Sequence, residues 1–417
     1  MTLQDRIFPL ASIEGRTFSR PRQAVILAGG RGERMRPFTD DRPKPMIPVL
    51  GRPFLEYQII QLREQGFERV LLLLGYRAED IRGYFGDGSR WGIRIDYSVT
   101  APERLTSSRV AAAKHLIDDC FLLLYCDNVW PMQMERLWAR FCESAKPAMI
   151  TVYANEDGYS KGGVQLASNG DVVCFDRYRR ARGLQEVEIS YAIITDLALE
   201  LVPIDDIAFE EAVYTELARQ RRLASFKTEH RYYSIGSPNR LPATERFLRR
   251  SPTVILDRDG VLNRKMPPAS YVRSWNEWQW CDGAMEALRL LHDRSFRVVV
   301  ATNQPGVARG AMTAADLDAV HAQMAEEARA AGGRIDAIYH CPHNWNDGCA
   351  CRKPKPGLLY QAQRELDLDL TQIVLIGDDE RDANAATAAG CHFRRVSQDV
   401  SLLDIVREVV LEKGAQR

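Results

Sequence analysis

The sequence predicts an α/β protein of two domains, each built around a largely parallel sheet. Three observations support this prediction. At 417 residues the chain is too long for one typical domain. In both halves short apolar runs alternate with helix-like segments, which is the pattern of parallel strands joined by crossover helices. Several of these runs end in glycine-rich or acidic segments, as strands do at the carboxyl edge of such a sheet, where ligands bind.

The first half places a glycine-rich segment after its first apolar run, in residues 24–48, AVILAGGRGERMRPFTDDRPKPMIP. We expect a strand over 24–28. The absence of side chains at Gly29, Gly30 and Gly32 lets backbone N–H groups approach a triphosphate. Arg34 in the loop and Lys44 between two prolines add two cations for the phosphates. The pattern predicts further helices over 53–64 and 78–84 and strands over 69–74 and 121–125.

This half resembles the sugar-1-phosphate nucleotidyltransferases, especially those that make GDP-activated heptose or mannose. The resemblance extends to about Arg250 and implies a doubly wound, Rossmann-like sheet that binds a nucleoside triphosphate. Asp127, after FLLLYC, matches the family's first metal-binding aspartate, although it could simply cap a turn. The implied nucleotide-binding residues are Gly29, Gly30, Gly32, Arg34, Lys44 and Asp127.

At three positions the sequence departs from that family's pattern. Ser234, in YSIGSP, stands where the second metal-binding aspartate is expected, and a neutral hydroxyl is a poor ligand for Mg²⁺. Residues 104–109, RLTSSR, replace the glycine-rich loop that approaches the base, and their side chains are expected to narrow that slot. Glu33 adds a negative charge beside Arg34. Two interpretations therefore stay open for this half, a nucleotidyltransferase and a non-catalytic module that binds nucleotide or sugar.

The second half opens with residues 253–263, TVILDRDGVLN, an apolar strand that ends in two aspartates. Asp257 is the candidate nucleophile, whose carboxylate attacks phosphorus to form an aspartyl-phosphate. Asp259 is the candidate acid and base, which protonates the leaving oxygen and later activates water. A solvated acidic turn is the alternative for this motif on its own.

Three later segments favour phosphoryl transfer over a solvated turn. VVVATN ends in Thr302 and Asn303, which are suited to hold phosphate oxygens, and CRKPKPG contributes the cations Arg352 and Lys353. The third segment, 373–382, IVLIGDDERD, is an apolar strand that runs into carboxylates, among them Asp378. In this order the segments resemble the haloacid dehalogenase phosphatase superfamily from about Pro252 onward. The expected Mg²⁺ ligands are the Asp257 and Asp378 carboxylates and the backbone carbonyl of Asp259.

Residues 340–352, HCPHNWNDGCACR, carry a second metal motif. Cys341, His343, Cys349 and Cys351 offer one imidazole and three thiols, the ligands of a tetrahedral structural Zn²⁺. Four unrelated residues in a surface loop are the alternative. Because this loop leads into Arg352 and Lys353, loss of the ion should misplace the phosphate-binding cations.

The zinc loop and residues 303–310, NQPGVARG, resemble the phosphatases that remove the 7-phosphate of D-glycero-D-manno-heptose 1,7-bisphosphate. Histidinol-phosphate phosphatases share the zinc cluster, so that substrate is the alternative. Arg309 favours the heptose substrate because it could pair with a second phosphate, although it could also be an ordinary solvated arginine.

Composition argues against several other classes of protein. Lysine plus arginine equal aspartate plus glutamate at 56 each, so no net charge attracts nucleic acid or an anionic membrane. No apolar run is long enough to span a bilayer, and residues 1–22 lack the apolar core of a secretory signal. Nine cysteines, four of them assigned to metal, fit a reducing cytoplasm.

We therefore expect an N-terminal extension over 1–22, a nucleotidyltransferase-like domain over 23–250 and a phosphatase domain over 251–417. Together they would serve the synthesis of nucleotide-activated heptose, with a sugar phosphate as substrate and Mg²⁺ and Zn²⁺ as cofactors. The phosphatase would remove the 7-phosphate, and the other domain would then add a nucleotide to the 1-phosphate. The anomer, the nucleotide and the oligomeric state stay open.

Overall fold

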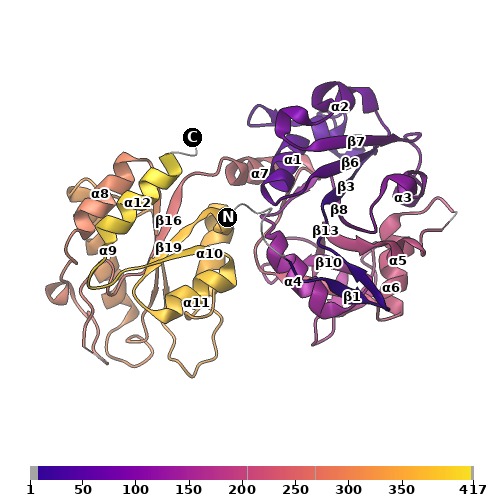
Figure 1. Cartoon of the computed structure of the whole chain (residues 1–417). Coiled ribbons are helices and arrows are strands. Elements are labelled where there is room, and N and C mark those ends of the chain that lie inside the picture. Colours follow the sequence, from indigo (N-terminus) through magenta and orange to yellow (C-terminus); the bar gives the residue numbers. More distant parts are fainter. Residues whose placement is uncertain (1–7, 204, 268, 415–417) are drawn as a thin grey trace. The chain divides into compact units, whose positions relative to one another are not determined.

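A computed structural model describes residues 8–203, 205–267 and 269–414 (Figure 1). It divides into two compact units, one up to Leu248 and one from Arg249 onward. None of the helices in these described ranges is long and apolar enough to cross a membrane.

The first unit is built on a seven-stranded sheet (Figure 1). Its strands, in spatial order, are β14 (Leu223–Thr228), β10 (Ala148–Tyr153), β13 (Val187–Thr195), β8 (Cys120–Tyr125), β3 (Gln23–Ala28), β6 (Arg69–Leu74) and β7 (Arg94–Val99). All neighbours are parallel except that β13 runs antiparallel to both β10 and β8. The sequence predicted β3, β6 and β8 and a parallel sheet, but not this reversal, because a strand buried on both faces has the same apolar pattern in either direction.

Helices cover both faces of this sheet. Alternate residues of β3 enter two different cores: Ala24 and Ile26 pack with α1 and α2, whereas Val25 and Leu27 pack with α3 and α6. The helices are α1 (Phe54–Glu64), α2 (Ala78–Phe85), α3 (Thr106–Ala113), α4 (Met134–Ser144), α5 (Asp196–Leu199), α6 (Thr215–Arg219) and α7 (Leu241–Leu248). The predicted doubly wound α/β fold is confirmed.

The predicted extension over 1–22 lies partly outside the described residues. Its described part forms a hairpin of β1 (Ala11–Ile13) and β2 (Arg16–Phe18), whose apolar side chains join the core. Trp138 of α4 donates its indole N–H to the Pro9 carbonyl at 2.7 Å. This segment is therefore packed against the rest of the first unit.

Three short strand pairs complete the first unit. They are β4 (Pro48–Val49) with β5 (Arg52–Pro53), β9 (Asn128–Val129) with β15 (Tyr233–Ser234), and β11 (Val164–Leu166) with β12 (Val172–Phe175).

The second unit has a five-stranded parallel sheet (Figure 1). Its order is β18 (Ala337–Cys341), β17 (Arg297–Asn303), β16 (Thr253–Leu256), β19 (Val374–Gly377) and β20 (His392–Arg395). Helices α8 (Ala284–Asp293), α9 (Ala314–Ala330) and α12 (Leu402–Gly414) cover one face, and α10 (Gly357–Leu366) and α11 (Glu380–Ala389) cover the other. The first strand, β16, lies at the centre, so the chain crosses to one side for β17 and to the other for β19. The sheet thus has a topological switch point at the end of β16, where ligands bind in such folds.

Candidate active site

The carboxyl ends of β16, β17 and β19 line one cavity of about 280 Å³. The sequence-predicted phosphatase residues all lie along its wall: Asp257, Asp259, Thr302, Asn303, Arg309, Arg352, Lys353 and Asp378. They come together because β16 is hydrogen-bonded to β17 on one side and to β19 on the other. Segments separated by more than a hundred residues therefore end at the same edge.

Asp257 faces a buried ammonium group. The Nζ atom of Lys353 lies 3.0 Å from Asp257 Oδ1 and 2.5 Å from Asp382 Oδ1, and it also donates to the Ala301 carbonyl at 2.8 Å. Burial and the neighbouring carboxylate of Asp382 raise the pKa of Asp257 to about 6, while the Lys353 charge opposes that rise. Lys353 thus favours the ionised form of Asp257, which is the form that can act as a nucleophile.

Asp259 is held by three side chains. Arg258, itself buried, donates to both carboxylate oxygens at 3.0 and 3.1 Å, Asn263 donates to Oδ1 at 3.0 Å, and Gln304 donates to Oδ2 at 2.7 Å. Burial works against the charge, but these donors outweigh it and hold the pKa of Asp259 below its usual range. The carboxylate is therefore fixed in position and ionised. Gln304 also donates to Thr302 Oγ1 at 3.0 Å, which links it to the neighbouring strand end.

Asn303 makes reciprocal hydrogen bonds with the backbone of Lys353. Its Nδ2 donates to the Lys353 carbonyl at 3.0 Å, and its Oδ1 accepts from the Lys353 N–H at 3.0 Å. The amide side chain thereby joins the end of β17 to the loop that carries the cation.

Three carboxylates at this edge could hold a cation: Asp257, Asp378 and Asp382. Asp378 also pairs with Lys265 at 2.7 Å, and burial raises the pKa of its carboxyl. Gly260, with φ of 87°, leaves room for it, since a Cβ there would lie 2.3 Å from Asp378 Oδ2. Asp382 and Lys265 also line the cavity, although the sequence motifs did not indicate them as members of the site. Asp378 precedes α11 and Asp382 lies in the first turn of that helix, four residues later, and this spacing was the signal that could have identified Asp382.

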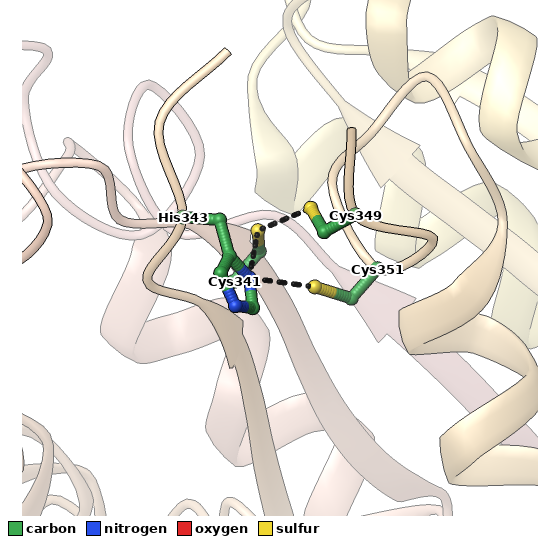
Figure 2. Close-up of side chains that lie close together, drawn as sticks. All are labelled: Cys341, His343, Cys349 and Cys351. Carbon is green, nitrogen blue, oxygen red and sulfur yellow. Dashed lines mark hydrogen bonds between the residues drawn. The ribbon is translucent and has the colours of Figure 1, made fainter. Parts of the chain in front are cut away.

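Figure 2 shows the four predicted zinc ligands converging from two segments. Cys341 Sγ lies 3.7 Å from Cys349 Sγ and 3.6 Å from His343 Nδ1, and that nitrogen lies 3.3 Å from Cys351 Sγ. The four ligand atoms all lie within 4.8 Å of one another. All nine cysteines fall within the described residues, and they are free thiols. The group can therefore bind one metal ion.

A further group of possible ligands, Asp318, His321 and His340, lies on α9 and β18. His321 Nε2 lies 3.2 Å from the Arg258 guanidinium, and burial lowers the pKa of this histidine to about 3. A fixed positive charge at that nitrogen opposes a second cation, so we interpret His321 as an acceptor that supports Arg258.

The first unit has its own cavity, of about 480 Å³. The structure brings all six predicted nucleotide-binding residues to its wall: Gly29, Gly30, Gly32, Arg34, Lys44 and Asp127. Lys44 Nζ lies 2.5 Å from Asp127 Oδ2. Glu33 lines the same cavity.

In the RLTSSR segment, Arg109 contacts the glycine-rich turn, a contact that the sequence motifs did not indicate. Its guanidinium donates to the carbonyls of Leu74 at 2.8 Å, Pro102 at 3.1 Å and Gly29 at 3.2 Å. A Cβ on Gly29 would lie 2.3 Å from Arg109 Cζ. Meanwhile the Ser107 hydroxyl donates to the Ile207 carbonyl at 2.6 Å. The arginine, rather than this serine, therefore lies against the glycine-rich turn.

Ser234 lies beside Asp127 in an adjoining cavity of about 820 Å³, which Glu188 also lines. The Ile235 N–H donates to the Asp127 carbonyl at 2.9 Å, so the two segments run side by side. Burial and the nearby Glu210 raise the pKa of Glu188 to about 8. Within the described residues, the groups of three or more possible metal ligands do not include Asp127.

Comparisons with known proteins identify two families in this chain, and the second match begins within the first unit, before the boundary at Leu248. Residues 23–176 match the family model of nucleotidyl transferases, and residues 205–390 match that of haloacid dehalogenase-like hydrolases. The chain is similar to the D-glycero-beta-D-manno-heptose-1,7-bisphosphate 7-phosphatase of Bordetella bronchiseptica, with 44% identity over 138 residues, 33% of this chain and 76% of that protein. It is also similar to the D-glycero-alpha-D-manno-heptose-1,7-bisphosphate 7-phosphatase of Mycobacterium bovis, with 38% identity over 142 residues, 33% of this chain and 74% of that protein.

A solved structure is also similar to the second half. The crystal structure of the D,D-heptose 1,7-bisphosphate phosphatase from B. bronchiseptica, complexed with magnesium and phosphate, shares 35% identity with this chain. The match covers 39% of this chain and 99% of that one, with a TM-score of 0.36.

Proposed function

The chain belongs, through its C-terminal half, to the family of D-glycero-D-manno-heptose-1,7-bisphosphate 7-phosphatases, and on that premise we propose that it removes the 7-phosphate of this sugar bisphosphate. One observation carries the proposal: Asp257 and Lys353 lie in a cavity to which Arg309 and Arg352 also contribute. A carboxylate nucleophile and several cations in one cavity suit a substrate that carries two phosphates.

The reaction follows from the contacts of these side chains. The Asp257 carboxylate attacks phosphorus and forms an aspartyl-phosphate, while Lys353 Nζ, 3.0 Å away, favours its charged form. Asp259 is oriented by Arg258 and Gln304. The negative charge of the bound phosphate raises the proton affinity of Asp259, so it can protonate the leaving oxygen and afterwards accept a proton from attacking water.

We assign Mg²⁺ to the carboxylates of Asp257 and Asp378 and the backbone carbonyl of Asp259. The residues fit this ion, since hard oxygen donors at strand ends are its preferred ligands. When bound, Mg²⁺ offsets the negative charge of the phosphate oxygens. Asp382 lies close to the carboxylates of Asp257 and Asp378. It supports the site by pairing with Lys353.

We assign Zn²⁺ to Cys341, His343, Cys349 and Cys351. With Zn–S bonds of about 2.3 Å and Zn–N bonds of about 2.0 Å, a tetrahedral site separates two sulfurs by about 3.8 Å and a sulfur from a nitrogen by about 3.5 Å. The separations of 3.7, 3.6 and 3.3 Å between the ligand atoms fit this geometry. Four protein ligands leave no open position, so the ion would be structural.

A second activity, nucleotidyl transfer to the remaining 1-phosphate, is supported by the cavity around Gly29, Arg34 and Lys44. The alternative function for this half is that of a non-catalytic module that binds nucleotide or sugar. Ser234 favours the non-catalytic module, because it leaves Asp127 without the second carboxylate of the family pattern.

Phosphate release from both anomers of the heptose bisphosphate, compared with histidinol phosphate, tests the substrate. Asp257→Asn is the matched control, because it keeps the shape of the site and removes the nucleophile. We expect one heptose anomer to have the highest kcat/KM. A preference for histidinol phosphate would overturn the proposed substrate while keeping the phosphatase.

A further inference from the structure

The loop that carries the four candidate zinc ligands also carries Trp345, between His343 and Cys349. Its side chain is 61% exposed although an indole ring is usually well buried. Trp345 lines the active-site cavity, so its ring borders the space available to a substrate. Core packing does not account for a ring in this position.

Two arginines from different segments approach this ring. The guanidinium carbon of Arg309 lies 4.3 Å from the ring centroid, and that of Arg352 lies 5.5 Å away. Both separations are within the range of cation–π attraction. The negative π face offsets part of the repulsion between the two positive charges and holds both beside the cavity.

Hydrogen bonds also hold the two guanidinium groups in place. Arg309 donates to the Tyr271 hydroxyl at 2.7 Å and to Asn344 Oδ1 at 3.2 Å, and Arg352 donates to the His343 carbonyl at 3.3 Å. Both residues therefore retain N–H groups that can donate to a phosphate, because a guanidinium has five. Three of the residues that contact these arginines, His343, Asn344 and Trp345, lie in the loop that carries the candidate zinc ligands.

We propose that Trp345 is a specificity-determining positioning residue, which holds Arg309 and Arg352 as a clamp for the phosphate that is not transferred. The inference rests on the proposed function, since a monophosphate has no group for this clamp. With this role for Trp345, the loop that carries the candidate zinc ligands determines substrate choice as well as stability.

The test compares two substrates in the full-length protein. The heptose 1,7-bisphosphate engages the clamp, whereas p-nitrophenyl phosphate, a monophosphate, reports on the transfer site around Asp257, Asp259 and Lys353 without the clamp. For Trp345→Ala we expect KM for the bisphosphate to rise about tenfold with kcat within about twofold, and kcat/KM for p-nitrophenyl phosphate to stay unchanged. Trp345→Phe should recover most of the affinity, because it keeps an aromatic face. Leu411→Ala, at an exposed position on α12, is the control and should change neither substrate.

Unchanged selectivity in Trp345→Ala, or equal losses on both substrates, would overturn the role of Trp345 and leave the proposed function intact. A natural protein with no preference for the bisphosphate over monophosphates would overturn both. The ratio of the two kcat/KM values within each preparation is independent of the fraction of folded protein, so a folding defect does not obscure the result.

Discussion

Replacement of Lys353 by methionine is the sharpest test of the electrostatics of the active site. Lys353 is 2% exposed, and its ammonium group lies between Asp257 and Asp382. At 3.0 Å, the Coulomb attraction within one such pair is about 5.5 kcal/mol at an effective dielectric constant of about 20. Loss of the cation leaves two buried carboxylates without their partner, which typically costs about 3–5 kcal/mol. Protonation of one carboxylate recovers part of this cost, so we expect a net loss of about 3 kcal/mol for the second unit.

Lys265→Met is the matched control, because the same substitution there removes a cation from a pair in which the lysine is 51% exposed. A half-exposed pair is screened by solvent, so this variant should lose no more than about 1 kcal/mol. The double variant Lys353→Met/Asp382→Asn should recover stability relative to Lys353→Met alone, because it removes one of the unpaired charges.

Hydrogen exchange of peptides that span β16 and β19 measures the opening free energy of this unit separately from the other. Protection lost equally in Lys353→Met and Lys265→Met would refute the reasoning. So would a double variant that is less stable than Lys353→Met, since that result would mean that Asp382 stabilises the site without the lysine. Phosphatase activity should fall in Lys353→Met. Loss of the ammonium group further raises the pKa of Asp257, so the proposed nucleophile becomes protonated at neutral pH.

The remaining predictions concern the nucleophile, the zinc loop and the first unit. Asp257→Asn should lower kcat by several orders of magnitude with an unchanged circular dichroism spectrum; near-normal phosphate release would exclude the covalent mechanism. Freshly purified protein should hold about one zinc ion per chain by elemental analysis, and Cys349→Ser should lose it and unfold at a lower temperature. Zinc-free protein with full activity would contradict the assignment. With heptose 1-phosphate and a nucleoside triphosphate, the natural chain should release pyrophosphate slowly, and Ser234→Asp should raise that rate by restoring a metal ligand. Rapid release by the natural chain would instead establish the first unit as a complete transferase.

Several central strands and helices were predicted from local patterns. The apolar runs over 69–74 and 298–303 correspond to β6 and β17, because a run buried on both faces and bounded by polar residues leaves few alternatives to a strand. The predicted helix over 53–64 corresponds to α1, which begins one residue later at Phe54. The reversed direction of β13 was not predictable, because its nearly continuous burial carries no sign of direction.

The sequence by itself determined which chemistry the chain carries, because its motifs lie next to one another along the backbone. Asp257 and Asp259 follow one strand, and the four candidate zinc ligands lie within eleven residues. Such local spacing, together with the rule that parallel strands end at one edge, is enough to assemble a candidate site.

Only the tertiary structure decided which groups support those motifs. Arg109 reaches the Gly29 carbonyl from eighty residues away, Asp382 shares the Lys353 ammonium with Asp257, and Trp345 contacts Arg309 across two loops. These contacts depend on strand order, register and side-chain direction, which are set by the packing of whole sheets and not by the residues next to each partner. An arginine, an aspartate or a tryptophan in a loop has the same local pattern whether it faces solvent or a binding site, and the fold alone distinguishes the two.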